Sequence, residues 1–230
     1  MLTDPLHVGV LTSKHAPGLD VLLRNPQRGI LYDVDCVITT ELSFPECRVP
    51  VIKHPIDSFY DNFAAPISNM RVRTHYDAAT AEILNRLGVD VVVMLGYLYV
   101  VTEPLLALFP NRMFNVHDAD LLLRRSDGRP KFPGLQATRD AILAGERSTR
   151  SSVHLVTADL DAGPVVARSE PYEVAPFVLD AARAGFIDVV RAYSYAHREW
   201  MIRDSWGDLV IEALEEVARF QDEHQEVAAV

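Results

Sequence analysis

The first half of the chain alternates short apolar runs with segments of helical periodicity. Three runs rich in valine, isoleucine and threonine are typical of β-strands; they cover residues 7–12, 34–40 and 49–54. A short helix is predicted over 18–24, where leucines recur at helical spacing. Residues 76–87 form a longer helical pattern with one apolar face, which Gly88 ends.

Directly after that helix, residues 89–96 (VDVVVMLG) are apolar at almost every position. A strand with one solvated face would alternate apolar and polar residues, so this run is expected to be covered on both faces. Strands of that kind occur in parallel sheets that carry helices on either side. Because helix followed by buried strand recurs from the amino terminus, the pattern predicts an α/β fold with a doubly wound, mainly parallel sheet of the Rossmann-like type.

The second half continues this alternation and then becomes helical. We expect further helices over 103–109 and 135–144, and further strands over 113–117, 152–156 and 163–168. From Pro176 onward the pattern predicts two helices with a break at 204–207. The expected organisation is an α/β domain over 1–175 and a C-terminal helical extension over 176–230 that packs on the same domain.

Composition and charge narrow the class of protein. A chain of 230 residues with 49% hydrophobic and 23% charged residues suits one domain with a sizeable core. The net charge of −10 argues against a nucleic-acid partner, because a phosphate-binding surface needs clustered lysine and arginine. The apolar run 89–101 is interrupted by Asp90 and too short to cross a membrane. With only Cys36 and Cys47 and no signal-peptide pattern, we expect a cytoplasmic protein.

The densest group of basic residues lies in one predicted loop and consists of Arg124, Arg125, Arg129 and Lys131. The sequence favours a solvated insertion over a binding surface, because charge runs of this kind usually face water. The functional alternative is that these cations meet an anionic tail or a phosphate on a substrate.

Candidate chemistry gathers where strands of the predicted sheet end, which is where open α/β sheets bind ligands. Asn115 and His117 are two residues apart on a predicted strand, so both side chains should point to the same face. Asp161 lies in a short loop, DLDAGP, between two apolar strands. Such a loop is expected to hold a carboxylate at the mouth of a cleft.

An amide, an imidazole and a carboxylate together suit acyl-type transfer. Asn115 and a protonated His117 could donate hydrogen bonds to an oxyanion, and Asp161 could hold the imidazole charged and oriented. No serine or cysteine lies in a recognisable nucleophile elbow, so direct transfer is simpler than a covalent intermediate. Each residue also has a structural interpretation: a hydrogen-bonded Asn-x-His pair, a core histidine at His154, and a turn-forming Asp161.

The order of the motifs resembles the folate-dependent formyltransferase family, and most closely its phosphoribosylglycinamide formyltransferase branch. The matching stretches are VDVVVMLGYLYVVTEPLL, FNVHDADLL, KFPGLQATRDAILAGE and SSVHLVTADLDAGPVV. The resemblance implies that Asn115, His117 and Asp161 are the catalytic residues. It implies a supporting place for His154, in the strand before the catalytic aspartate. Asp118, beside His117, adds a second carboxylate that could support the imidazole or simply face solvent.

The resemblance also implies the donor and where it binds. Members of the family use 10-formyltetrahydrofolate as formyl donor and need no metal. The pterin ring would be held by Leu98, Tyr99, Val100 and Val101 together with a second loop that includes Thr157 and Asp159. The expected activity is one-carbon transfer of the type used in purine biosynthesis, to a small-molecule amine acceptor.

Several positions depart from the family pattern. The loop after the first strand, TSKHAPGL, would supply Ser13, Lys14, His15 and Gly18 to an acceptor phosphate, but it lacks the family's Gly-Ser-Asn-rich backbone cradle. A proline usual after the catalytic histidine is Asp118 here, and an arginine usual in the pterin segment is Tyr99. Residues 118–131 form a longer loop than the family has. The acceptor, anionic or not, stays open.

Other functions remain open at this stage. The acceptor could be an amino-sugar nucleotide, or water, which would make the protein a deformylase. A metal-dependent hydrolase is a second class, with ligands drawn from His117, Asp118, Asp120, His154 and Asp161. A non-catalytic folate-binding relative is a third. The sequence leaves the oligomeric state open, with a homodimer as one option.

Overall fold

The computed structural model describes residues 4–228, except for the side chains of 221–228. Its central element is a seven-stranded sheet with the order β3-β2-β1-β4-β5-β7-β8. The strands are β1 (Leu6–Thr12), β2 (Tyr32–Thr39), β3 (Val51–Lys53), β4 (Val91–Met94), β5 (Met113–His117), β7 (Ser152–Leu155) and β8 (Val165–Arg168). The pairs from β3 to β5 are parallel, and the pairs β5–β7 and β7–β8 are antiparallel. The predicted doubly wound, mainly parallel sheet is therefore confirmed.

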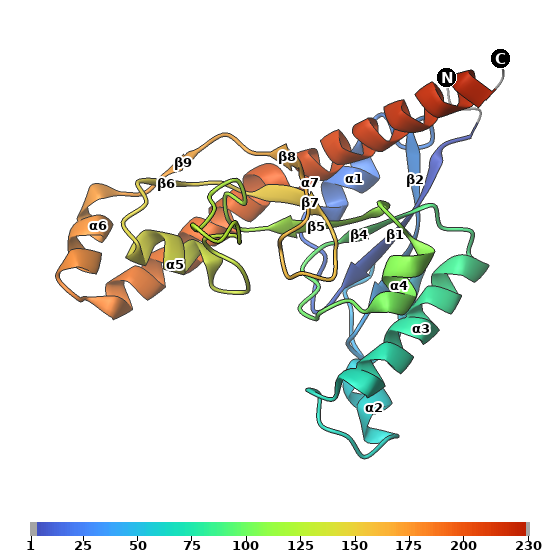
Figure 1. Ribbon diagram of the computed structural model, residues 1–230, viewed down its shortest axis with the longest axis horizontal. Helices are drawn as coiled ribbons and strands as arrows, with labels where there is room; N and C mark the ends of the chain where they lie inside the picture. The colour runs from blue at the N-terminus through green and yellow to red at the C-terminus, as the bar shows by residue number, and fades with distance from the viewer. Residues whose placement is uncertain (1–3, 229–230) are drawn as a thin grey trace.

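Helices cover both faces of the sheet, as Figure 1 shows. The helices are α1 (Leu19–Arg24), α2 (Ile56–Asp61), α3 (Met70–Arg86), α4 (Glu103–Leu108), α5 (Ala137–Leu143), α6 (Pro176–Arg183) and α7 (Ile187–Ala228). One core cluster joins the sheet to α1 and α7, and another joins it to α3 and α4. None of these helices combines the length and the apolar character that crossing a bilayer requires.

Strand β4 shows why the run 89–96 has no polar alternation. Val91 and Val93 pack in the core cluster that contains α7 residues, whereas Val92 and Met94 pack in the cluster that contains α3 and α4 residues. Val91, Val92 and Val93 are fully buried. Both faces of the strand are covered, so each position needs an apolar side chain.

The predicted break at 204–207 is wrong, because α7 passes through it without interruption. Gly207 has a packing role instead. A Cβ at that position would lie 2.4 Å from Cβ of Val21 in α1, so the glycine allows the two helices to approach closely. The tail does contain two helices, but the chain breaks at 184–186, between α6 and α7.

Three further details escaped the sequence pattern. Helix α3 begins at Met70 rather than at residue 76, because the Asn69 side chain accepts hydrogen bonds from the backbone N–H groups of Arg71 and Val72 and caps the helix. Helix α2 was not expected. A short antiparallel pair, β6 (Ser148–Thr149) with β9 (Tyr172–Glu173), lies outside the central sheet.

Candidate active site

A cavity of about 240 Å³ opens beyond the carboxyl ends of β4 and β5. Three segments that the sequence singled out line it: the stretch after β4, the end of β5 and the loop after β7. The predicted residues among its lining are Leu98, Tyr99, Val100, Val101, Asn115, His117, Asp118, His154, Thr157, Asp159 and Asp161. The structure therefore brings the proposed catalytic residues and the proposed pterin segment to one cavity.

Asn115 is oriented by a histidine on the neighbouring strand. The antiparallel register places it opposite His154, and its Nδ2 lies 3.2 Å from Nε2 of that ring. The other ring nitrogen of His154, Nδ1, lies 2.9 Å from the backbone oxygen of Leu155 and donates to it. Nε2 then accepts from the Asn115 amide, which leaves the second N–H of that amide available to a ligand.

Burial, the largest influence, lowers the pKa of His154 below its usual value; the hydrogen bond to Leu155 and the charge of Asp161 act against it. The neutral ring is the form that can accept from Asn115. His154 is therefore placed to orient the amide; the supporting role that the resemblance implies for it stays a prediction.

His117 is fixed on both sides of its ring. Its Nε2 donates to the backbone oxygen of Phe132 at 2.9 Å, and its Nδ1 lies 3.6 Å from Oδ2 of Asp161. The residue is buried, as is Asp161. A protonated ring would thus face a buried carboxylate that compensates its charge.

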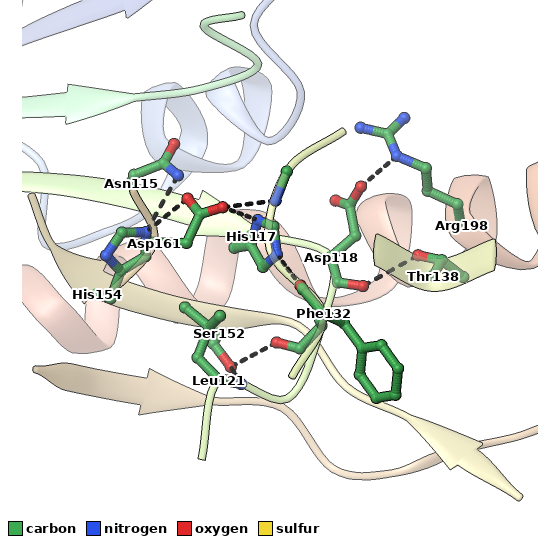
Figure 2. Close-up of polar contacts among 12 residues, drawn as sticks. Asn115, His117, Asp118, Leu121, Phe132, Thr138, Ser152, His154, Asp161 and Arg198 are labelled. Atoms are coloured by element: carbon green, nitrogen blue, oxygen red, sulfur yellow. Dashed lines mark hydrogen bonds and ion pairs between the residues drawn. The ribbon is translucent and has the colours of Figure 1, made fainter. Parts of the chain in front are cut away.

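The loop that carries Asp161 is folded tightly against β7. Asp161 has a left-handed backbone with φ of 52°, a conformation that aspartate tolerates better than most residues. Its Oδ2 accepts a hydrogen bond of 2.7 Å from the backbone N–H of Gly134. Gly163 admits no side chain, because a Cβ there would lie 1.9 Å from the backbone oxygen of Leu155. These contacts hold the loop so that the carboxylate points toward His117, as Figure 2 shows.

Asp118 pairs with an arginine that the sequence gave no reason to select. Its Oδ2 accepts from Nε of Arg198 in α7, and its Oδ1 is buried without a hydrogen bond to any described residue. Arg198 also lines the cavity, together with Trp206 from the same helix. The pairing joins residues 80 positions apart, and no local pattern could have predicted it.

Two further contacts at the site were missed. The N–H of Gly134 and the carbonyl of Phe132 position Asp161 and His117. Both come from the segment KFPGL, which begins one of the stretches that match the family but was given no role there. They are backbone groups, so side-chain chemistry could not have pointed to them.

The predicted phosphate loop lies beside the cavity and does not line it. Ser13 is buried and its Oγ accepts from the backbone N–H of Leu98, so it braces the pterin segment. Gly18 faces α7, since a Cβ there would lie 2.8 Å from the backbone nitrogen of Gly207. Lys14 and His15 are exposed, and His15 lines a separate hollow. A phosphate site in this loop stays a prediction.

The basic insertion forms a small turn held by its own backbone. Arg125 and Arg129 are joined by a backbone hydrogen bond of 2.8 Å, as are Lys131 and Leu123 at 2.9 Å. At its start, the Oγ of Ser152 donates to the backbone oxygen of Ala119 at 2.8 Å. The guanidinium groups of Arg124 and Arg125 are exposed, and each donates to a backbone carbonyl group of the same loop. This arrangement agrees with the solvated insertion that the sequence favoured.

In the part of the chain that the structure describes, no group of three or more histidine, cysteine, aspartate or glutamate residues is arranged to hold a metal ion. His117, His154 and Asp161 do come together, but their ring nitrogens are engaged as described above. What the site offers is a free amide N–H, a buried His–Asp pair and an adjoining apolar wall. Those groups can stabilise developing charge on a carbonyl oxygen.

The known proteins that this chain resembles agree with that chemistry. A family described as formyl transferase matches residues 47–176, which is more than half of the chain. The chain belongs to the formyl transferase family. The matched region contains every residue of the cavity except Arg198 and Trp206.

Individual relatives are similar over parts of the chain. Phosphoribosylglycinamide formyltransferase from Escherichia coli is 31% identical over 98 residues, 43% of this chain and 42% of the relative. Formyltetrahydrofolate deformylase from Bacillus subtilis is 29% identical over 99 residues, 43% of this chain and 30% of the relative. Thus the aligned stretches span less than half the length of these relatives. The crystal structure of glycinamide ribonucleotide transformylase 1 from Symbiobacterium toebii is 28% identical, with a TM-score of 0.62 over 87% of this chain and 89% of that one.

Proposed function

We propose that the protein transfers a formyl group from 10-formyltetrahydrofolate, bound as a substrate, to the amine of a small molecule. The observation that carries this proposal is the meeting of Asn115, His117 and Asp161 at one cavity that the segment Leu98–Val101 also lines. That wall combines apolar side chains with backbone polar groups, which suits a flat heteroaromatic ring. Membership of the formyl transferase family supports the donor.

Transfer proceeds by direct attack. The acceptor nitrogen forms a bond to the formyl carbon while the formyl oxygen gains negative charge; the bond from that carbon to the folate nitrogen then breaks. The free N–H of Asn115 is placed to donate to this oxygen, with a protonated His117 as the second positive group. The proton lost by the amine ends on the folate nitrogen, and Asp161 is the carboxylate at the cavity that can relay it through water.

The remaining features of the site prepare these groups. His154 holds the Asn115 amide, and the backbone of Phe132 and Gly134 holds His117 and Asp161. These hydrogen bonds come from the protein's own groups, and donors and acceptors held in this way need little reorganisation at the moment of reaction. We propose a small amine as the acceptor. The oligomeric state is a separate matter, and the homodimer that the sequence analysis gave as one option stays a prediction.

Water is the second candidate acceptor. The similarity to a formyltetrahydrofolate deformylase favours it, since the same donor and the same polar trio could hydrolyse the formyl group to formate. Release of formate as the product, in place of a formylated amine, would identify this reaction.

The test begins with calorimetric titration of the protein with a 10-formyl folate analogue, followed by assays with added amines. We expect binding, and amine-dependent release of the deformylated folate. Asn115→Ala should lower turnover by on the order of 10²–10³ while binding of the analogue stays close to that of the unmodified protein. Asn85→Ala, at an exposed position of α3, is the matched control and should change neither. Unchanged turnover in Asn115→Ala would contradict the assignment.

A further inference from the structure

A second hollow adjoins the cavity, between α5 and α7. It has a volume of about 240 Å³ and is lined by Leu135, Gln136, Thr138, Arg139, Arg191, Ser194, Tyr195 and Arg198. We call it the arginine groove, after its three arginines. Leu135 and Arg198 line both the groove and the cavity, so the two spaces meet at these side chains.

Arg198 is held in place by one end of its guanidinium group. Its Nε donates to the buried carboxylate of Asp118, whose side chain is 9% exposed. If the guanidinium group moved away, the buried carboxylate of Asp118 would lose its compensating charge, so the pairing holds the guanidinium group in position. Its two terminal nitrogens point away from Asp118 in Figure 2, and Nη1 lies 3.7 Å from Oε1 of Glu199, beyond hydrogen-bond distance. The bridge therefore leaves donors of Arg198 available to a ligand.

Among the residues that the structure describes, the other two arginines are paired only with carboxylates close to them in sequence. Arg191 contacts Asp188 at 3.2 Å with side chains that are 66% and 93% exposed. Arg139 contacts the adjacent Asp140 at 3.3 Å. Exposed pairs of this kind contribute little to stability, so an anion in the groove can compete with them.

The loop after β1, by contrast, is largely committed to the fold. The backbone N–H of Ser13 donates to Gly96, and its side chain accepts from Leu98. The backbone carbonyl of His15 accepts from Thr12, and Pro17 has no N–H. Gly18 is in contact with the backbone of α7. Arginine side chains, which carry a permanent charge and up to five donors, are found in the groove and not in this loop.

We propose that the arginine groove binds an anionic group, carboxylate or phosphate, of the acceptor amine. This inference rests on the proposed function and names the class of its acceptor. The anion lies against Arg139, Arg191 and Arg198, while the amine extends past Leu135 to Asn115 and His117. Arg198, anchored by Asp118, stands where the anion site meets the reacting groups, so it positions the acceptor.

The experiment follows the arginine Nε–Hε signals and the backbone amide signals of the ¹⁵N-labelled full-length protein by nuclear magnetic resonance. The protein is titrated with inorganic phosphate or with malonate at constant ionic strength. We expect saturable shifts of the signals of Arg139, Arg191 and Arg198 with at least one of these anions. Phosphate alone would indicate a phosphorylated amine, and malonate alone an amine that carries a carboxylate.

Two matched variants give the control. Arg191 and Arg183 each form an exposed pair with the aspartate three residues before them, but only Arg191 lines the groove. Arg191→Ala should weaken binding of the effective anion by about tenfold, as expected for the loss of one charge-assisted contact. Arg183→Ala should leave it unchanged. Equal effects of the two variants, no saturable shift, or shifts confined to Lys14 and His15 would each overturn the proposal.

The same samples separate this inference from the proposed function. Binding of the 10-formyl folate analogue is measured on each variant by calorimetry. If the analogue binds but no anion does, the arginine groove is wrong and formyl transfer stands. If the anions bind as expected but the analogue does not, the groove is an anion site in a protein that does not use a folate donor, and the acceptor assignment falls with the proposed function.

Discussion

Two largely buried polar clusters lie near the proposed pterin segment, Leu98–Val101, and they are built differently. The first, which we call the catalytic cluster because the proposed function assigns the reaction to it, consists of Asn115, His117, His154 and Asp161. It lines the cavity, and both of its rings and its carboxylate have hydrogen-bond partners. The anchor cluster consists of Arg73, Asp77, Tyr97 and Thr102. Its Asp77 side chain is fully buried and Arg73 is 3% exposed, and neither residue lines the cavity.

The anchor cluster holds a backbone rather than a ligand. Oδ2 of Asp77 accepts from both the N–H and the hydroxyl of Thr102, each at 2.7 Å, and so fixes the end of the pterin segment. The guanidinium carbon of Arg73 lies 4.6 Å from the ring centre of Tyr99. Three buried atoms of the cluster make no hydrogen bond to a described residue: Arg73 Nη1, Asp77 Oδ1 and the Tyr97 hydroxyl.

Under the proposed function, the catalytic cluster carries out the reaction and the anchor cluster holds the pocket in shape. In the catalytic cluster, hydrogen bonds orient groups that remain open to a substrate, so substitutions there should change turnover more than stability. In the anchor cluster, charges are enclosed at a cost in free energy to hold Thr102 and Tyr99. Substitutions there should change stability first, and turnover only through the shape of the pocket.

The largest effect is expected for Asp161→Asn. The amide oxygen can still accept from Gly134, and asparagine tolerates the left-handed backbone, so the fold should persist. The charge that faces His117 is lost, and turnover should fall by on the order of 10² or more. Steady-state kinetics with thermal unfolding measures both. If the variant lost stability in proportion to its activity, Asp161 would have a structural role like that of the anchor cluster, and the distinction between the two clusters would fail.

Next, Arg73→Met should destabilise the fold by about 2–4 kcal/mol, because Asp77 loses its nearby cation and Tyr99 loses its stacking partner. Turnover per folded molecule should change much less than it does in Asp161→Asn. Arg71→Met, at an exposed position of the same helix, is the matched control and should stay within about 0.5 kcal/mol. Chemical denaturation provides the measurement. A loss no larger than that of the control would show that the anchor cluster has no such role.

A smaller effect of opposite sign is expected for Asp77→Asn. Burial, opposed by the Thr102 hydrogen bonds and by Arg73, raises the pKa of Asp77 from 3.8 to about 6. The folded state therefore binds this proton at a higher pH than the unfolded chain does. The group costs stability above about pH 6, and that cost disappears as the pH falls toward 4. The variant should gain about 1–3 kcal/mol at pH 8 and nothing at pH 4, as followed by urea denaturation across pH. A gain that does not depend on pH would mean that Asp77 is not the titrating group.

The smallest effect concerns His154. Because burial lowers its pKa, the unfolded chain binds the proton first, and stability should decline as the pH falls below about 6.5. His154→Asn should make this decline shallower. The part of the decline that persists in this variant should come from His54 and His197, since burial also lowers their pKa values. Turnover should fall several-fold as well, since Asn115 loses its orienting partner. If the decline of stability below about pH 6.5 were the same in His154→Asn and in the unmodified protein, the lowered pKa of His154 would be contradicted.

Much of the fold could be predicted because its signals are local. The bounds of β5 were predicted from the sequence as they occur, and the unbroken apolar run of β4 predicted a strand covered on both faces. Asn115, His117 and Asp161 could be selected because strand ends collect ligands, and the cavity does bring them together. Their catalytic roles remain a proposal.

The remainder depended on contacts between distant segments. Arg198 meets Asp118 across 80 positions, and Gly134 meets Asp161 across 27. The expected break at Gly207 failed for the same reason, because a glycine that suggests a helix end from sequence alone here fits the crossing with α1. Neither an arginine on a long helix nor a backbone N–H carries a local signature of such a partner.

The measurement that tests the central claim most directly follows the formyl carbon itself. The protein is supplied with 10-formyltetrahydrofolate labelled with ¹³C in the formyl group and with a set of anionic and neutral amines, and products are identified by mass spectrometry. Formyl transfer predicts a labelled N-formyl product, with one deformylated folate for each, and loss of both in Asn115→Ala. Label found only as formate would identify a deformylase, and label that stays on the folate with every amine would contradict the account.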